Sequence, residues 1–282
     1  MNLTNLSCIR EIMARHGIAP QKRYGQNFLI NPTVVERIAE TCADCDAGVI
    51  EIGPGIGTLT RELAPRFKKV VALEIDENLI PVLEETLSDF DNVKVINTDA
   101  MKTDLAVLIK EEFAGMKVYV CANLPYYITS PVVMKLLESG GIFEAVTVMI
   151  QKEVADRFCA EPGSTDYGAI TLAVNYYSDA EKCFCVAPGN FMPPPKVTSS
   201  VIKMKIRKEP PVRVRDTDAM FSLIRAAFAC RRKTLVNAVC TSGLCGKEEL
   251  TGILEKLGYD ANIRGERLSL ADFARISDEL TK

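Results

Sequence analysis

The chain has 282 residues, of which 48% are hydrophobic and 25% charged, and its formal net charge at pH 7 is −3. This composition is typical of a globular protein and excludes wholesale disorder. No apolar run approaches the roughly 20 residues that a membrane-spanning helix needs, and the N-terminus does not resemble a signal peptide. We therefore expect a soluble cytoplasmic protein with no membrane partner.

The predicted elements begin with a helix at Asn31-Pro32, where an N-cap residue precedes a proline in the first turn. Downstream, short apolar runs alternate with longer amphipathic stretches. The runs predict strands at Val49–Ile52, Val70–Leu73, Val93–Ile96, Val118–Cys121 and Val146–Ile150. Helices are predicted between most of them, notably at Thr58–Phe67, Leu79–Leu87 and Pro131–Leu137. This alternation predicts an α/β fold with a Rossmann-like, doubly wound, mostly parallel sheet.

The pattern changes near the C-terminus, after a further strand at Val201–Ile206. Short amphipathic stretches predict helices at Met220–Cys230, Thr234–Val239, Lys247–Leu257 and Leu270–Leu280. We expect residues 1–208 to form the sheet domain, with an N-terminal segment that closes over its ligand, and residues 209–282 to form a small all-helical domain.

The ten cysteines include several inside apolar runs, as expected of buried free thiols in a reducing compartment. The pairs Cys42/Cys45 and Cys183/Cys185 have a metal-like spacing, but no nearby histidine completes a tetrahedral set. We therefore expect no metal.

Basic residues are concentrated between Lys203 and Lys233, where ten of them stand against three acidic residues. A local basic surface on an acidic protein can neutralise the phosphates of a nucleic acid. Judged from charge alone, however, a solvent-exposed charged surface that binds no nucleic acid is the favoured interpretation.

A glycine-rich turn, Gly53-Pro54-Gly55-Ile56-Gly57, follows the strand Val49–Ile52 and opens a helix. Glycines let the backbone turn sharply and approach a nucleotide-like ligand. The spacing Gly-x-Gly-x-Gly, rather than the Gly-x-Gly-x-x-Gly of dinucleotide sites, favours S-adenosyl-L-methionine over NAD.

Two carboxylates follow the next two strands. Glu74 can accept hydrogen bonds from both ribose hydroxyls of an adenosine group, and Asp99 is placed to bond the adenine amine. Asp76 and Glu77 are interpreted as ordinary surface carboxylates. Because the carboxyl ends of parallel strands share one edge, Glu74, Asp99 and the glycine turn should define one crevice.

The run Asn123-Leu124-Pro125-Tyr126 follows the strand Val118–Cys121. An adenine amine is a poor nucleophile, because its lone pair is delocalised into the ring. The Asn123 side-chain oxygen and a main-chain carbonyl, that of Leu124, can accept its hydrogens and favour a pyramidal nitrogen. Pro125 fixes the turn, and Tyr126 offers a ring on which a base can stack.

These motifs resemble those of the ribosomal RNA adenine N6,N6-dimethyltransferase family, and specifically its KsgA branch, over nearly the whole chain. Tyr24–Leu29 resembles the family's N-terminal cofactor-closing segment, Asn190–Val197 its second substrate loop and Arg264–Phe273 its C-terminal signature. Tyr127 departs from the family, in which some members carry asparagine at this position; we expect it to be tolerated.

The resemblance implies the class I methyltransferase fold, with S-adenosyl-L-methionine as the cofactor. Cofactor contacts would fall on Asn27, Leu29, Gly53, Gly55, Glu74, Asp99 and Asn123. The target adenine would lie near Asn123, Leu124, Pro125, Tyr126 and Phe191, with Phe191 stacking on its other face. The implied substrate is a pair of adjacent adenines near the 3′ end of 16S rRNA in an assembling small ribosomal subunit. Candidate phosphate contacts are Lys22, Arg23, Lys203, Lys205, Arg231, Arg232 and Lys233.

Three alternatives remain open. The sister family that methylates large-subunit RNA and confers macrolide resistance is usually more basic and reads Asn-Ile-Pro-Tyr where this chain has Asn123–Tyr126. A DNA adenine methyltransferase would more often read Asp-Pro-Pro-Tyr. A mainly non-catalytic ribosome assembly factor could use the same fold.

Overall fold

The computed structural model describes residues 1–19, 21 and 25–282. Their contacts divide them into two compact units, one made of residues 1–155 and 180–206 and the other of residues 156–179 and 207–282. Lys22 and Arg23, predicted to contact phosphates, and Tyr24 of the predicted closing segment lie outside the described residues.

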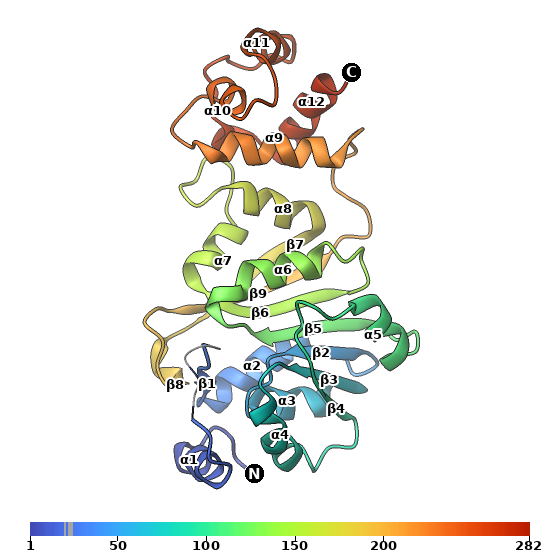
Figure 1. Ribbon diagram of the computed structural model, residues 1–282, viewed down its shortest axis with the longest axis vertical. Helices are drawn as coiled ribbons and strands as arrows, with labels where there is room; N and C mark the ends of the chain where they lie inside the picture. Colours follow the sequence, from blue (N-terminus) through green and yellow to red (C-terminus); the bar gives the residue numbers. More distant parts are fainter. Residues whose placement is uncertain (20, 22–24) are drawn as a thin grey trace. The chain divides into compact units, whose positions relative to one another are not determined.

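A seven-stranded sheet lies at the centre of the first unit in the described part of the chain, with the order β4-β3-β2-β5-β6-β9-β7 (Figure 1). Its strands are β2 (Gly48–Ile52), β3 (Lys69–Glu74), β4 (Val93–Asn97), β5 (Val118–Asn123), β6 (Ala145–Gln151), β7 (Ser178–Val186) and β9 (Ser199–Ile206). Strands β2 to β6 are parallel, and β9 is antiparallel to β6. The predicted mostly parallel α/β sheet is therefore confirmed.

One helix directly precedes the first strand of this sheet, and others follow most of its strands, as predicted. They are α2 (Pro32–Cys42), α3 (Thr58–Leu63), α4 (Ile80–Thr86), α5 (Leu105–Glu112), α6 (Thr129–Leu137) and α7 (Lys152–Phe158). The predicted start of α2 is confirmed, because the Asn31 side chain accepts a hydrogen bond from the Thr33 amide over 3.1 Å.

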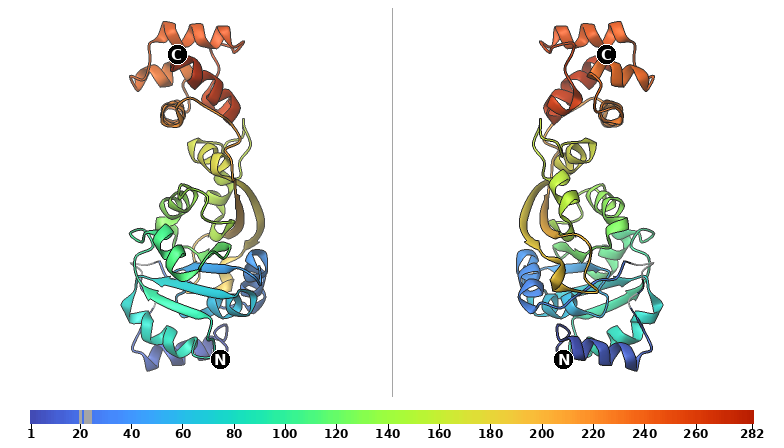
Figure 2. Two further views of the ribbon diagram at one scale, coloured as in Figure 1. Left: turned by 90° about the vertical axis from the view of Figure 1, so that its right-hand side faces the viewer. Right: turned by 90° about the vertical axis from the view of Figure 1, so that its left-hand side faces the viewer.

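Apolar side chains fix α2 and α3 against one face of the sheet. Ile38 of α2 and Leu59 of α3 belong to the same buried cluster as Val49 of β2 and Met149 of β6. Figure 2 shows α2 (blue) and α6 (green) on opposite sides of the strands. The sheet is thus covered on both faces, which suits its largely apolar parallel strands.

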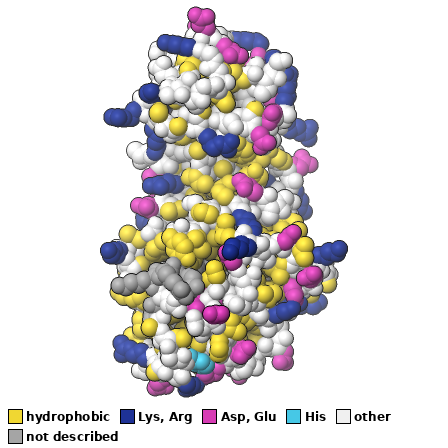
Figure 3. All heavy atoms as spheres, viewed as in Figure 1, with side chains coloured by type: hydrophobic (Ala, Val, Ile, Leu, Met, Phe, Trp, Pro, Cys, Tyr) yellow, Lys and Arg dark blue, Asp and Glu magenta, His cyan; other side chains and the backbone are white. Residues whose placement is uncertain are grey.

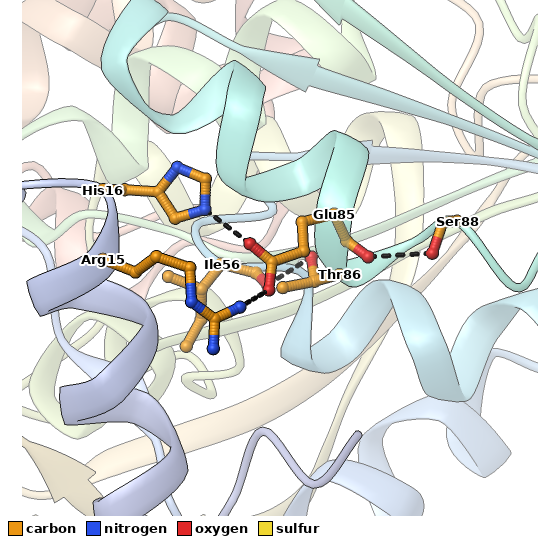
Figure 4. A network of polar contacts seen from close by, with 6 residues as sticks. All are labelled: Arg15, His16, Ile56, Glu85, Thr86 and Ser88. Atoms are coloured by element: carbon orange, nitrogen blue, oxygen red, sulfur yellow. Dashed lines mark hydrogen bonds and ion pairs between the residues drawn. The ribbon is translucent and has the colours of Figure 1, made fainter.

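An N-terminal helix, α1 (Leu6–Arg15), packs on α4. Ile12 of α1 and Leu83 of α4 are buried in one apolar cluster. Beside them the Glu85 carboxylate pairs with the Arg15 guanidinium and, over 2.6 Å, with Nε2 of His16 (Figure 4). A short strand, β1 (Phe28–Leu29), pairs antiparallel with β8 (Phe191–Met192) in a separate two-stranded sheet.

The second unit contains α8 (Ala169–Tyr177), α9 (Thr217–Ala229), α10 (Leu235–Thr241), α11 (Lys247–Lys256) and α12 (Leu270–Leu280). The structure differs from the predicted division at residue 208 in one segment, because residues 156–179 group with the C-terminal helices. The physical reason is burial: Tyr167 and Leu172 pack in the same core as Leu223 of α9 and Phe273 of α12. In the described residues, no helix is both long and apolar enough to cross a membrane.

Candidate active site

A cavity of about 300 Å³ opens at the carboxyl ends of β2, β3 and β5, in the first unit. This edge is where open α/β sheets bind ligands. The cavity brings together ten of the predicted site residues: Asn27, Leu29, Gly53, Gly55, Glu74, Asp99, Asn123, Leu124, Pro125 and Tyr126. The glycine turn and the Asn123–Tyr126 turn thus share one cavity, as the sequence predicted.

The glycine turn depends on left-handed backbone at Gly53 and Gly55, where φ is +69° and +62°. A Cβ atom at Gly55 would lie 3.2 Å from the Phe28 ring, so a side chain there would press on the N-terminal segment. The Gly55 amide donates to Oε2 of Glu74 over 3.3 Å. The turn therefore leaves room for a ligand and touches the carboxylate at the end of β3.

Glu74 is only 4% exposed, and burial raises its pKa even though the amides of Asp76 and Gly55 donate to its carboxylate. The Asp76 amide donates over 2.8 Å. A buried carboxylate is stabilised by further donors. Hydroxyl groups of a ligand in the cavity would supply them.

Asp76 was interpreted as an ordinary surface carboxylate, and that interpretation is wrong, because its exposed fraction is 2%. Its Oδ2 accepts hydrogen bonds from the side-chain amides of Gln21 and Gln26, over 3.1 and 3.2 Å. Asp76 thus links the end of β3 to the N-terminal segment. The donors lie 50 or more positions away in sequence, which is why local sequence gives no signal for this role.

Glu51 is a second buried carboxylate in the cavity lining, and the sequence analysis did not assign it a role. Burial raises its pKa to about 8, an effect that the nearby Thr60 hydroxyl opposes and that repulsion from Glu74 assists. Among the described residues, its Oε2 has no hydrogen-bond partner. The signal that could have identified Glu51 is a single carboxylate inside the otherwise apolar run Val49–Ile52.

The loop after β4 carries Asp99, whose Oδ1 accepts a hydrogen bond from the Met101 amide over 2.8 Å. Asp99, Met101 and Ile75 all line the cavity, and the last two are exposed apolar side chains. A flat, partly apolar ligand group such as a purine fits between such side chains with a polar edge toward Asp99.

The Asn123–Tyr126 turn forms the opposite wall of the cavity. The Asn123 side-chain amide donates to the Asn27 carbonyl over 3.2 Å, and the Leu124 amide donates to the Met149 carbonyl over 3.2 Å. The Tyr126 hydroxyl lies 2.8 Å from the Ser199 hydroxyl, and burial raises its pKa. These bonds hold the Asn123 oxygen, the Leu124 carbonyl and the Tyr126 ring in a fixed arrangement.

Phe191 is not among the residues that line this cavity. Its side chain is 3% exposed and packs with Leu29 and Val35 in the cluster beneath α2. The Phe191 ring is therefore part of the hydrophobic core. Its stacking role stays a prediction, and a ring in this position would have to move to meet a bound base.

Some of the basic residues predicted to contact phosphates are already bonded to main-chain carbonyls, and others are exposed. Lys203 is half-buried and donates to the Thr41 carbonyl over 2.6 Å, and Arg231 donates to the carbonyls of Thr165 and Tyr167. Lys205, Arg232 and Lys233 are exposed, and Lys and Arg side chains are spread singly over the face shown in Figure 3. RNA contact by all of these residues stays a prediction.

The ten cysteines are free thiols. Within residues 1–19, 21 and 25–282, no group of three or more His, Cys, Asp or Glu side chains is arranged to hold a metal ion.

Comparison with known proteins gives one consistent result. The family model described as ribosomal RNA adenine dimethylase matches residues 19–282. The chain is 48% identical over 276 residues to the ribosomal RNA small subunit methyltransferase A of Geobacillus thermodenitrificans, covering 96% of this chain and 94% of that protein. It is 46% identical over 286 residues to the protein of the same name from Streptococcus thermophilus, covering 99% and 98%.

Two solved structures are similar over most of the chain. A dimethyladenosine transferase from Plasmodium falciparum has a TM-score of 0.74 at 29% identity, over 88% of this chain and 95% of that one. The 23S rRNA methyltransferase ErmE has a TM-score of 0.69 at 26% identity, over 91% of this chain and all of that one.

Proposed function

The chain belongs to the ribosomal RNA adenine dimethylase family, and we propose the substrate and the residue roles that follow from that premise. It is an S-adenosylmethionine-dependent enzyme with the class I methyltransferase fold, and it dimethylates adenines of ribosomal RNA. We propose that its substrate is the pair of adjacent adenines near the 3′ end of 16S rRNA, modified in the cytoplasm within an assembling small subunit. The single cavity that contains both Glu74 and Asn123 is the observation that carries the assignment of the site.

The residues of the cavity fit the cofactor. Bound there, S-adenosylmethionine supplies a methyl group carried on a positively charged sulfur. The buried carboxylates Glu51 and Glu74 suit a ligand rich in hydroxyl and ammonium donors, and Glu51 Oε2 lacks a partner in the described part of the chain. Gly53 and Gly55 let the backbone approach it. We assign the ribose hydroxyls to Glu74 and the adenine amine to Asp99.

We assign activation of the target amine to Asn123 and Leu124. The Asn123 Nδ2 already donates to the Asn27 carbonyl, which leaves Oδ1 as an acceptor for one amine hydrogen. The Leu124 carbonyl accepts the other. Both bonds favour a pyramidal nitrogen whose lone pair points at the methyl group. The amine becomes cationic on methylation and then loses a proton, so no base with a shifted pKa is required.

Tyr126 serves as the stacking platform for the target base. An adenine must leave its stack to reach the cavity, at a cost of a few kcal/mol. Stacking on an aromatic ring stabilises the flipped-out base by about 1–3 kcal/mol. The Tyr126 hydroxyl bond to Ser199 holds the ring in place for that contact. Exposed basic residues, among them Lys205, Arg232 and Lys233, are proposed to bind the surrounding phosphates.

Two observations favour the small subunit over the large one. Two relatives named small subunit methyltransferase A are 48% and 46% identical to this chain over nearly its full length, whereas ErmE is 26% identical. The acidic net charge of −3 also differs from the basic character of the macrolide-resistance family. The intact Asn123–Tyr126 turn in the cavity favours catalysis over a purely structural role in assembly.

The test is methyl transfer from radiolabelled S-adenosylmethionine to isolated small and large subunits that lack the modification. We expect incorporation into small subunits that approaches four methyl groups per particle, as dimethyladenosine. Incorporation into large subunits alone would support the macrolide-resistance reading. Binding to small subunits without methylation would support an assembly factor.

A further inference from the structure

Lys135, in the last turn of α6, holds the loop that follows β4. Its ammonium group donates to the carbonyl oxygens of Ala100, Met101 and Thr103, over 3.0, 2.7 and 2.7 Å. A lysine ammonium has three N–H donors and no acceptor, so these bonds use its full capacity. Bonds from a charged donor are stronger than those between neutral groups.

The loop that Lys135 holds is one wall of the cavity, since Asp99, Ala100 and Met101 line it. The loop is also bonded within itself: the amides of Lys102 and Thr103 donate to the Asp99 carbonyl over 2.9 and 3.0 Å. These bonds shape the loop but do not attach it to another element.

The helix that carries Lys135 belongs to the opposite wall. Helix α6 begins at Thr129, separated from the end of the Asn123–Tyr126 turn by two residues, and Val132 of α6 lines the cavity. Lys135 therefore connects the wall that faces the cofactor adenine with the wall that faces the target base.

We propose that Lys135 is a positioning residue of the cofactor site, which fixes the Asp99 loop at the distance from α6 that a bound adenine requires. The inference rests on the proposed role of Asp99 and goes beyond it by naming the group that places Asp99. Lys135 does not touch the cofactor. Its loss leaves three loop carbonyls without their donor, so the loop samples positions in which Asp99 is displaced from the adenine.

The experiment compares Lys135→Met, which keeps the length of the side chain, with Lys135→Arg, which keeps a charged donor. Lys110→Met is the matched control, because Lys110 is an exposed lysine on α5, the helix that follows this loop. The affinity for S-adenosylhomocysteine is measured by calorimetry. KM for S-adenosylmethionine, KM for RNA and kcat are measured separately.

For Lys135→Met we expect the dissociation constant of S-adenosylhomocysteine and the KM for S-adenosylmethionine to rise about ten-fold, the effect of losing one or more net hydrogen bonds. We expect KM for RNA and kcat at saturating cofactor to change less than about three-fold. Lys135→Arg should recover part of the affinity, and Lys110→Met should behave as wild type.

A second measurement needs no cofactor. In the free protein, amide hydrogen exchange of Met101, Lys102 and Thr103 should accelerate in Lys135→Met while exchange in β2 and β5 stays unchanged. Unchanged exchange in this loop, or a loss of affinity no larger than in Lys110→Met, would overturn the proposal. The wild-type protein tests the proposed function separately: if it binds the cofactor and methylates small subunits, that function stands whatever Lys135→Met does.

Discussion

The side-chain amide of Asn123 donates a hydrogen bond to the main-chain carbonyl of Asn27 over 3.2 Å, across 96 positions of sequence. This bond determines which end of the amide group faces the cavity, because the nitrogen is occupied and the oxygen remains as the acceptor. It also ties the N-terminal segment to the turn after β5, so the position of one affects the other.

Replacement of Asn123 by alanine should lower kcat far more than RNA affinity. The acceptor that it removes acts on the reacting nitrogen, and loss of one such preorganised group costs on the order of 100-fold or more in turnover. Single-turnover methylation and a filter-binding assay with the same RNA measure the two quantities. Equal losses in both would assign Asn123 a role in positioning alone.

Replacement of Glu74 by alanine should abolish detectable binding of S-adenosylhomocysteine, since it removes the carboxylate that we assign to the ribose. Glu77→Ala is the matched control, because Glu77 lies three positions away and is exposed. Calorimetric titration of both variants is the measurement. Normal methylation by Glu74→Ala would show that the cofactor assignment is wrong.

Replacement of Asp76 by alanine should destabilise the protein and weaken cofactor binding together. Gln21 and Gln26 would lose a buried acceptor, which costs about 1–3 kcal/mol for each group left without a partner and less where water replaces it. Urea unfolding measures the first effect and KM for S-adenosylmethionine the second. If both values match those of Glu77→Ala, Asp76 does not anchor the N-terminal segment.

Glu51 predicts a pH dependence of stability. Its pKa is about 8 in the folded protein against 4.5 as the ordinary value. Between these pH values the folded protein holds a proton that the unfolded chain has released, so stability falls as pH rises, by at most about 1.4 kcal/mol per pH unit. Glu51→Gln cannot ionise at this position and so lacks this pH dependence. The unfolding free energy of the variant minus that of wild type should therefore increase from pH 5 to pH 8.

Urea denaturation of both proteins at pH 5, 6.5 and 8 measures this difference in unfolding free energy. Subtracting the two values cancels the contributions of all other titrating groups, because those groups are the same in both proteins. Parallel pH profiles would show that Glu51 ionises as freely in the folded state as in the unfolded one.

The strands that local sequence predicted well include two almost fully buried ones of the parallel sheet, β2 and β3. Every residue of β2 is buried, and all but the first of β3, so their runs of valine, isoleucine and alanine identify them without further information. Strand β7 was missed because it lies at the edge of the sheet and most of its side chains are not buried. Its pairing with β9 depends on residues that follow it in the chain.

The side-chain roles that could not be predicted from sequence depend on hydrogen bonds and packing contacts with residues that are distant in the chain. Glycine turns and strand ends placed Gly55, Glu74, Asp99 and Asn123 in one cavity, because strand order alone brings them together. Lys203 alternates with apolar residues along its strand, as a solvent-facing lysine would, but its ammonium is bonded to the Thr41 carbonyl of α2. Phe191 and Asp76 differ from expectation in the same way, since tertiary packing decides which side chains are covered.

The order of strands has a consequence for synthesis of the protein. In the chain β7 precedes β9, yet in the sheet β9 lies between β6 and β7. As translation proceeds, β7 leaves the ribosome before its neighbour exists, and the apolar edge of β6 stays unpaired until residue 206 has emerged. A nascent chain cut short in this interval exposes a strand edge suited to aggregation, which makes it a candidate client for chaperones.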